Sequence, residues 1–139
     1  MIISLLNSKV TFQYHIIGMI NEKIVPILID TGAAWSHVSK EICDNFEILS
    51  EPRTVLKFDG SLKIMSQSTV IRLKLRKLEE FQLKTLIDEQ PNKFLFGIDF
   101  LEQFEYSITS EYLLLDGSEQ PRHKLHEETI KSFLKNYND

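Results

Sequence analysis

The feature that most constrains the fold of this chain is an apolar run that ends in an acid and a glycine. Residues 24–29 read Ile-Val-Pro-Ile-Leu-Ile, and Asp30-Thr31-Gly32-Ala33 follows directly. A run so rich in β-branched side chains predicts a buried strand. Gly32 permits a tight turn that brings backbone N–H groups close to the Asp30 carboxylate. The pattern predicts an acid at the end of a buried strand, either as a water-activating carboxylate or as a residue that caps a turn.

Two further patterns follow in the chain. The segment Phe94-Leu95-Phe96-Gly97-Ile98-Asp99-Phe100-Leu101 is a second apolar run, interrupted by one glycine. Between the two runs, Phe58-Asp59-Gly60-Ser61 joins two strand-like segments, residues 54–58 and 61–65. Asp-Gly suits the φ > 0 positions of a tight hairpin turn. These patterns indicate a hairpin between two buried β segments.

Together the three motifs resemble those of the retropepsin family, the retroviral-type aspartic proteases. In that family Asp-Thr-Gly-Ala is followed by two apolar residues and a glycine, commonly continuing as Gly-x-Asp-Phe-Leu. The matching elements here are Asp30-Thr31-Gly32-Ala33, Phe96-Gly97 and Asp99-Phe100-Leu101, and Ser36 and Val38 fit the usual continuation of the first motif. Asp59-Gly60-Ser61 stands where the family carries its flap hairpin. The resemblance spans roughly residues 10–115.

The resemblance implies a role for each residue of the first motif. Asp30 would be the catalytic carboxylate. The Thr31 hydroxyl would hydrogen-bond across a dimer axis, and Gly32 would allow the close backbone approach that keeps two carboxylates nearly coplanar. Ala33 would lie beside the substrate backbone. The motif would thus supply the acid and its supporting loop.

The other two motifs have implied roles as well. Phe96 and Gly97 would pass beneath the active loop, where glycine permits tight threading. Asp59, Gly60 and Ser61 would form the flap tip, which closes over an extended peptide and excludes water. The peptide would bind as an added β-strand. Two departures from the family stand out: Phe96 replaces a more usual aliphatic residue, and the returning arm, residues 64–68, lacks a glycine often found there.

A single Asp-Thr-Gly has a mechanistic consequence. Aspartic-protease chemistry uses two carboxylates that share a proton, one to activate water and one to polarise the scissile carbonyl. A chain with one such acid must obtain the second from elsewhere, and a two-fold homodimer is the simplest source. We therefore expect a homodimer in which two Asp30 side chains meet, and an inert monomer.

The density of short alternating segments predicts an all-β fold. We expect a closed, mostly antiparallel acid-protease barrel with a flap hairpin and a short helix, residues 100–104, after the second glycine motif. Apolar residues at helical spacing past Pro121 predict an extra C-terminal helix from about His126 to Tyr137. We accordingly divide the chain into a protease domain, residues 1–117, and a C-terminal helical extension or linker, residues 118–139.

Composition limits the possible partners and compartments. Sixteen basic and twenty acidic residues give a net charge of −4 without a basic stripe, so nucleic-acid binding has no electrostatic support. Cys43 is alone, which suits a reducing compartment, and we interpret it as a packed thiol. No segment reaches membrane-spanning length, and residues 1–6 are too short for a signal sequence. We expect a soluble protein of the cytoplasm or a viral particle, although a piece excised from a polyprotein is an alternative.

Other candidate residues carry less chemistry. His15, His37, His123 and His126 are scattered, and no cluster has metal-ligand spacing, so neither a metal nor another cofactor is expected. Ser36 and Ser61 lack a His-acid partnership. Asp99 is interpreted as a structural acid near the second motif. Trp35 could shape a substrate pocket, line the dimer interface or belong to the core.

The sequence thus predicts an aspartic endopeptidase that acts on extended polypeptides, among which viral or retroelement polyproteins are candidates. One alternative is a catalytically silent retropepsin-fold module that binds proteins. An intact Asp-Thr-Gly argues against it, since a silent site has no need of the acid. A small β-barrel with a chance motif would require all three matches to be accidental.

Overall fold

The computed structural model of this 139-residue chain describes residues 12–43, 48–56, 59–126 and 128–132. Strands predominate in the described part, as the alternating patterns predict. In chain order the elements are β1 (Phe12–Ile20), β2 (Lys23–Ile29), β3 (His37–Ser39), the 3-10 helix η1 (Lys40–Cys43), β4 (Ile48–Leu56), β5 (Leu62–Lys74), β6 (Phe81–Asp88), β7 (Phe94–Phe96), α2 (Ile98–Leu101), β8 (Tyr106–Ile108), β9 (Tyr112–Leu115), β10 (Ser118–Pro121) and β11 (His123–His126).

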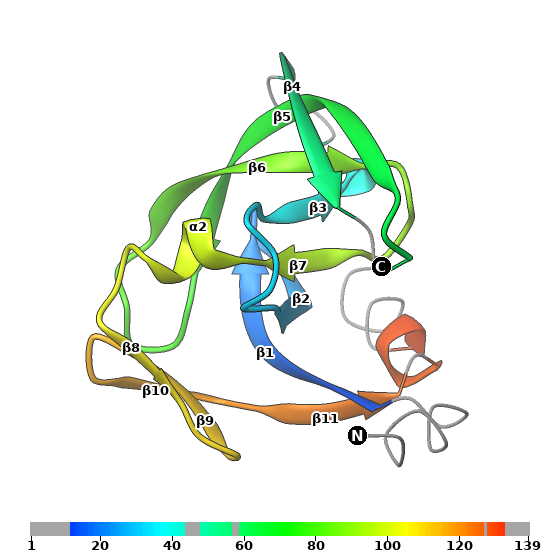
Figure 1. The fold of residues 1–139 in the computed structure, drawn as a ribbon. Helices are drawn as coiled ribbons and strands as arrows, with labels where there is room; N and C mark the ends of the chain where they lie inside the picture. Colours follow the sequence, from blue (N-terminus) through cyan, green and yellow to red (C-terminus); the bar gives the residue numbers. More distant parts are fainter. Residues whose placement is uncertain (1–11, 44–47, 57–58, 127, 133–139) are drawn as a thin grey trace.

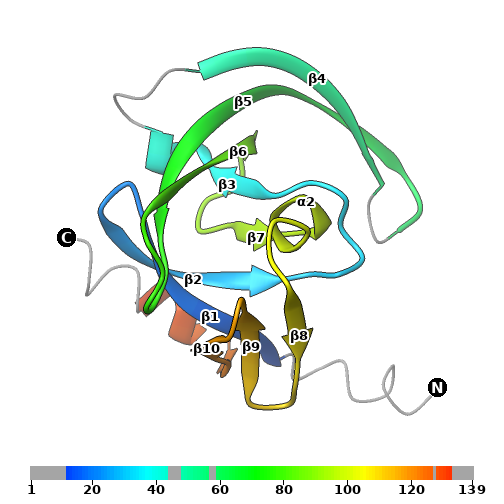
Figure 2. The same cartoon turned by 90° about the vertical axis from the view of Figure 1, so that its left-hand side faces the viewer.

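Strands β1, β2, β7, β3, β6 and β5 close into a barrel, which Figures 1 and 2 show from two sides. The main sheet has the order β11-β1-β2-β7-β3-β6-β5-β4, and β1 also pairs with β5. In this closing contact Met19 pairs with Lys74 and Ile20 pairs with Leu73. Adjacent strands are antiparallel except for two parallel pairs, β2 with β7 and β3 with β6. The expected closed, mostly antiparallel all-β fold is confirmed.

The turn between β1 and β2 is hydrogen-bonded to other parts of the barrel. Asn21 and Glu22 both have positive φ, 50° and 71°, which is typical of tight hairpin turns. The Asn21 side chain accepts a hydrogen bond from the Arg72 amide at 2.9 Å and donates one to the Ile42 carbonyl at 3.2 Å. These bonds hold the turn against the barrel, and β2 runs from this turn along the barrel wall to Asp30.

The core fills the barrel with branched aliphatic and aromatic side chains. Phe96, which replaces an aliphatic residue of the family pattern, is fully buried with its ring centroid 4.7 Å from that of Phe100. The ring centroid of Phe100 lies 5.3 Å from that of Phe104 and 6.4 Å from that of Phe81. The aromatic replacement is therefore accommodated by a cluster of aromatic rings, which packs α2 against the barrel.

The C-terminal part of the chain differs from the prediction. Residues 118–126 form β10 and β11, which the sequence analysis did not identify as strands. Strand β10 pairs with β9, β11 pairs with β1, and the Arg122 guanidinium lies 4.6 Å from the centre of the Tyr14 ring. The predicted C-terminal helix is present, with described helical residues 128–132, but His126, its approximate predicted start, ends β11. Pairing with existing strands overrode a weak local preference.

The helix after the second glycine motif also begins earlier than expected. It covers Ile98–Leu101 instead of residues 100–104, with Gly97 at its N-cap position and without a side-chain cap. Residues 1–11 and 133–139 lie outside the described part, as does the side chain of Cys43. Division of the chain at residue 117 stays a prediction. Among the described residues, no helix is both long and apolar enough to span a bilayer.

Candidate active site

The Asp30 loop begins where β2 leaves the barrel. The Asp30 amide donates to the Phe96 carbonyl at 2.9 Å, and the Ala33 amide donates to the Asp30 carbonyl at 3.2 Å. The Asp30 carboxylate is half-buried, and its Oδ1 atom accepts a hydrogen bond from the Gly32 amide at 2.8 Å. Thr31 and Gly32 are exposed. The loop therefore presents one oriented carboxylate at the surface of the chain.

Gly97 lies directly beneath this loop. Strand β7 pairs in parallel with β2 through Phe96 and Ile29, and the Ile98 amide donates to the Ala33 carbonyl at 2.8 Å. A Cβ atom added to Gly97 would lie 2.3 Å from the Ala33 carbonyl oxygen. This separation is far below a van der Waals contact, so the two backbones can approach in this way because residue 97 has no side chain.

Ser36 and Asp99 lock the second motif to the first. The Ser36 hydroxyl donates to Asp99 Oδ1 at 2.7 Å and accepts from the Gly97 amide at 3.1 Å. The Ser36 amide donates to Asp99 Oδ2 at 3.0 Å. Ser36 is fully buried. We call Asp30–Ala33, Ser36, Gly97 and Asp99 the base of the site.

The bonding of Asp99 separates its role from that of Asp30. Both Asp99 oxygens accept hydrogen bonds from Ser36, and Oδ1 also accepts one from the Phe100 amide at 2.9 Å. The side chain is therefore committed to holding the base together. The sequence analysis identified Asp99 as a structural acid but did not identify Ser36 as its partner. A signal for this pairing is that Ser36 and Asp99 each follow a glycine motif at a short interval.

The predicted flap residues lie at the tip of the β4–β5 hairpin, which arches over the barrel (Figure 2). Asp59 Oδ1 accepts hydrogen bonds from the Ser61 amide at 2.8 Å and from its hydroxyl at 2.6 Å, and Gly60 has φ +85°. A register shift between Ser50 and Arg53 marks a bulge that bends β4. We call residues 48–64 the flap hairpin; Phe58 lies outside the described residues.

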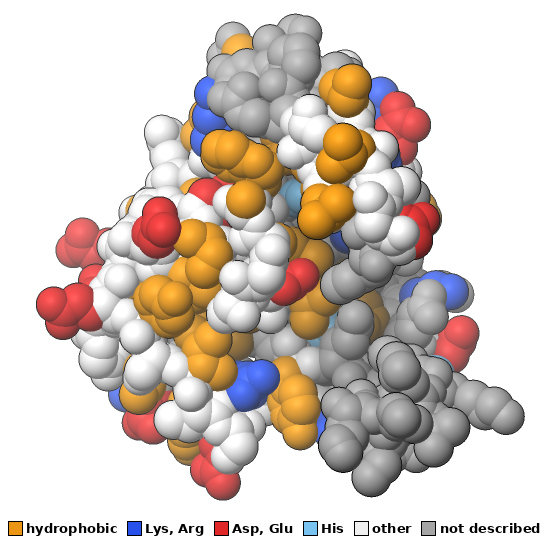
Figure 3. All heavy atoms as spheres, viewed as in Figure 1, with side chains coloured by type: hydrophobic (Ala, Val, Ile, Leu, Met, Phe, Trp, Pro, Cys, Tyr) orange, Lys and Arg blue, Asp and Glu red, His pale blue; other side chains and the backbone are white. Residues whose placement is uncertain are grey.

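The flap hairpin carries exposed apolar side chains. Leu56 and Leu62 pair across its tip and are 70% and 68% exposed, and Ile64 is 70% exposed. Hydrophobic side chains are visible over this hairpin in Figure 3. No heavy atom of the described structure would contact a Cβ added at Gly60. The structure thus places Asp30–Ala33 and Phe96–Gly97 together, and Asp59–Ser61 on a separate projecting element.

A buried acid, Asp88, lies where the flap hairpin meets the barrel. Lys93 Nζ is 3.5 Å and Lys63 Nζ is 3.9 Å from its carboxylate, and the Gln90 amide donates to it at 2.9 Å. His37 Nδ1 is 3.6 Å away, an electrostatic contact beyond hydrogen-bond length. Burial by itself would raise the Asp88 pKa, but His37, the Gln90 amide and the two lysines together hold that pKa well below its ordinary value. Asp88 is therefore ionised in the folded protein at neutral pH.

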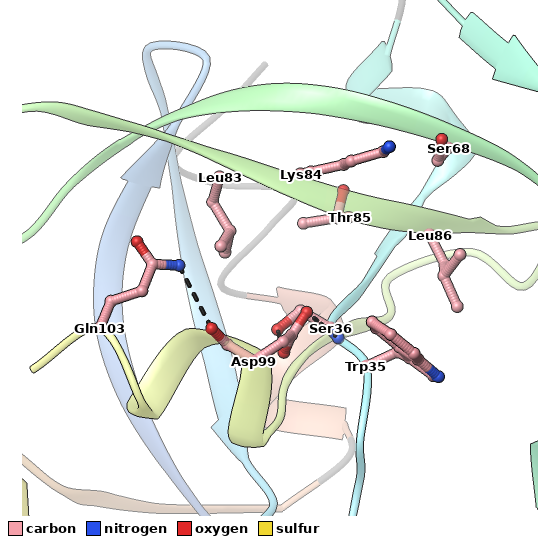
Figure 4. Close-up of a pocket in the computed structure, with 9 residues that line it drawn as sticks. All are labelled: Trp35, Ser36, Ser68, Leu83, Lys84, Thr85, Leu86, Asp99 and Gln103. Carbon is pink, nitrogen blue, oxygen red and sulfur yellow. Dashed lines mark hydrogen bonds between the residues drawn. The ribbon is translucent and has the colours of Figure 1, made fainter. Parts of the chain in front are cut away.

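A cavity of about 220 Å³ lies between β6 and α2, beside the base (Figure 4). Leu83 and Leu86 project toward it from β6, and Trp35 and Asp99 lie across from them (Figure 4). Trp35, five residues after Asp30, is 38% exposed. The structure thus places Trp35 at the wall of a cavity and not in the core, and its roles in a substrate pocket or a dimer interface stay predictions.

Comparison with known proteins adds independent information. The family described as "gag-polyprotein putative aspartyl protease" matches residues 16–103. "Uncharacterized protein 7" of soybean chlorotic mottle virus is 46% identical over 119 residues, which cover 85% of this chain and 80% of that protein. "Putative Polyprotein CP" of cassava vein mosaic virus is 30% identical over 132 residues, which cover 81% of this chain and 10% of the polyprotein. This chain therefore corresponds to a small part of that polyprotein.

Two solved structures share the fold. EIAV protease complexed with the inhibitor HBY-793 superposes with a TM-score of 0.52 at 19% identity, covering 64% of this chain and 85% of that protease. The retroviral protease-like domain of Ddi1 from Leishmania major superposes with a TM-score of 0.59 at 14% identity, covering 81% of this chain and 92% of that domain. At these identities the similarity shows a retroviral-protease fold.

Proposed function

Because this chain belongs to the gag-polyprotein aspartyl protease family, we propose that it is an aspartic endopeptidase that hydrolyses extended polypeptides. A water molecule activated by two Asp30 carboxylates, one from each subunit of a homodimer, would attack the scissile carbonyl. The observation that carries this proposal is the half-buried Asp30 carboxylate, oriented by the Gly32 amide on an otherwise exposed loop. An acid presented in this way is suited to meet a second one.

The chain's own acids support a second subunit as the source of the other carboxylate. Asp99 is the acid of the second glycine motif, and both of its carboxylate oxygens accept hydrogen bonds from Ser36. Asp88 is buried against two lysines. In a dimer the exposed Thr31 and Gly32 would face their counterparts across the two-fold axis, with the Thr31 hydroxyl bonding across it and Ala33 beside the substrate. The flap tip, Asp59–Ser61, would then cover the peptide.

We infer that the substrates include viral polyproteins. One relative is named as a polyprotein of cassava vein mosaic virus, and another is a protein of soybean chlorotic mottle virus. A polyprotein offers extended linkers between its domains, which fit a cleft that binds peptide as an added strand. Hydrolysis of such a substrate would require no metal or other cofactor, because the paired carboxylates would activate water themselves.

Cleavage of a peptide library, read by mass spectrometry between about pH 4 and 7, tests the proposal. Wild type should cleave, most rapidly at mildly acidic pH where one of the two carboxylates is protonated. Asp30→Asn should abolish cleavage, whereas Asp116→Asn, a matched change in an exposed turn, should leave it intact. Equal cleavage by wild type and Asp30→Asn would contradict the mechanism.

Enzyme concentration provides a second test. A dissociable dimer should lose specific activity on dilution, in parallel with a fall in molar mass measured by analytical ultracentrifugation. Constant specific activity down to the dilution at which the protein is monomeric would rule out the shared site. A folded dimer that cleaves no library peptide would favour the catalytically silent, protein-binding alternative.

A further inference from the structure

Two lysines share one buried carboxylate at a position between the flap hairpin and the base. Lys63 and Lys93 lie 3.9 Å and 3.5 Å from Asp88, whose side chain is 3% exposed. The two lysine side chains are themselves 43% and 37% exposed. The carboxylate is therefore enclosed, while both lysine side chains are partly exposed.

The positions of the lysines relate this cluster to the proposed substrate cleft between the flap hairpin and Asp30. Lys63 is two residues past Ser61 on the returning arm of the flap hairpin. Lys93 directly precedes β7, whose last residue, Phe96, accepts the hydrogen bond from the Asp30 amide. Three residues of extended chain span about 10 Å. The Lys93 backbone is therefore about 10 Å from that of Phe96, which is hydrogen-bonded to Asp30, and Lys63 reaches Asp88 from the flap hairpin.

The charges of the cluster do not balance. One ammonium group would compensate the Asp88 carboxylate, and the second leaves a surplus positive charge, in a chain whose net charge is −4. His37, the other side chain in contact with Asp88, is buried and carries no negative charge. A partly exposed surplus cation beside a cleft favours an anionic group of the ligand.

We propose that Lys63 and Lys93 form a specificity site for an acidic side chain, glutamate or aspartate, of the extended polypeptide substrate. The inference rests on the proposed protease function and names a residue preference within it. The substrate carboxylate would take the outer side of the two ammonium groups, whose inner side contacts Asp88. The lysines bind substrate, and Asp88 competes with the substrate carboxylate for them.

The test uses a cleavable library peptide with Glu, Gln or Lys placed in turn at each of the four positions on either side of the scissile bond. Wild type should cleave the Glu peptide about tenfold faster than the Gln peptide, in kcat/KM, at one of these positions. Raising the salt concentration should reduce the preference, because the ammonium groups are partly exposed. Equal kcat/KM for Glu and Gln at all eight positions would overturn the proposal while leaving the protease function established.

Variants separate recognition from structure by moving the preference in opposite directions. Lys63→Gln and Lys93→Gln should each lower the Glu-to-Gln ratio, and Lys63→Glu should favour the Lys peptide. Asp88→Asn should raise the Glu-to-Gln ratio, because both ammonium groups then lack their inner partner. Lys77→Gln, a matched change in an exposed turn, should leave the ratio unchanged; a change as large as that of Lys63→Gln would contradict the site.

A binding measurement keeps the proposal testable without turnover. Asp30→Asn protein should bind the uncleaved Glu peptide about tenfold more tightly than the Gln peptide, measured by calorimetry. If wild type cleaves nothing and the binding preference is present, the specificity site stands and the protease function fails. Equal affinities for the two peptides would overturn the specificity site.

Discussion

The base and the flap hairpin are built in opposite ways. In the base, Gly97 leaves no room for a methyl group beneath Ala33, and Ser36 and Asp99 bond the two glycine motifs together. The tip of the flap hairpin is held by bonds within itself, Asp59 to Ser61, and its leucines face solvent. Hydrogen bonds between distant parts of the chain are therefore concentrated around Asp30, the proposed catalytic acid, whereas the tip of the flap hairpin is held by local bonds.

Changing one glycine in each region gives the largest expected contrast. Gly97→Ala should destabilise the protein by about 3–5 kcal/mol, because its Cβ would overlap the Ala33 carbonyl and force the two strands apart. Gly60→Ala should cost about 1 kcal/mol, since the site is open and the cost is the positive φ alone. Urea unfolding measures the free energy of unfolding of both variants, and equal losses of stability would show that the two glycines are not differently constrained.

Removing the Ser36 hydroxyl should have the next largest effect. Ser36→Ala deletes a hydrogen bond to the Asp99 carboxylate and leaves the Gly97 amide without its acceptor, which should cost about 1.5–3 kcal/mol. The exposed Ser110 offers a matched control, and Ser110→Ala should change stability by no more than about 0.5 kcal/mol. A Ser36→Ala variant as stable as its control would show that the lock is not needed.

Asp88 contacts Lys63 of the flap hairpin and Lys93 beside β7, and its contribution to stability should depend on pH. Its pKa in the folded protein is below the ordinary value of 3.8, so its stabilising contribution is full above that pH. As the pH falls, the unfolded chain takes up the proton first and the contribution declines. The difference in free energy of unfolding between wild type and Asp88→Asn should therefore shrink from about pH 6 to about pH 3. A constant difference over that range would contradict the lowered pKa of Asp88 in the folded protein.

The smallest effect on stability is expected in the flap hairpin. Leu62→Ser should change the free energy of unfolding by no more than about 0.5 kcal/mol, because the side chain is 68% exposed. Under the proposed function the same change should lower kcat/KM, since it removes apolar surface from the element that covers substrate. Leu73→Ser in the core is the control and should unfold the protein far more readily. A large loss of stability for Leu62→Ser would show that the tip is packed.

Much of the architecture could be predicted from local patterns. The β-branched run before Asp30 and the Asp59-Gly60 turn each specify their structure within a few residues, and the structure contains both. The strands β10 and β11 escaped prediction because residues 118–126 have little β preference and acquire it by pairing with β9 and β1. The short helix was placed two residues late because its start depends on Gly97 being held beneath Ala33, a contact between distant parts of the chain.

The sequence by itself determined the fold class and the order of the motifs, and it supplied Asp30 as the proposed catalytic acid, because strand alternation, turn chemistry and the Asp-Thr-Gly signature are local properties. The tertiary structure decided which groups meet. It joined Ser36 to Asp99, placed the Ala33 carbonyl against Gly97, and gathered Lys63, Lys93 and His37 around Asp88. Apart from the contact of Lys93 with Asp88, these contacts connect residues far apart in the chain, and strand pairing brings them together. Their energies depend on distance and burial, which residue order alone does not contain.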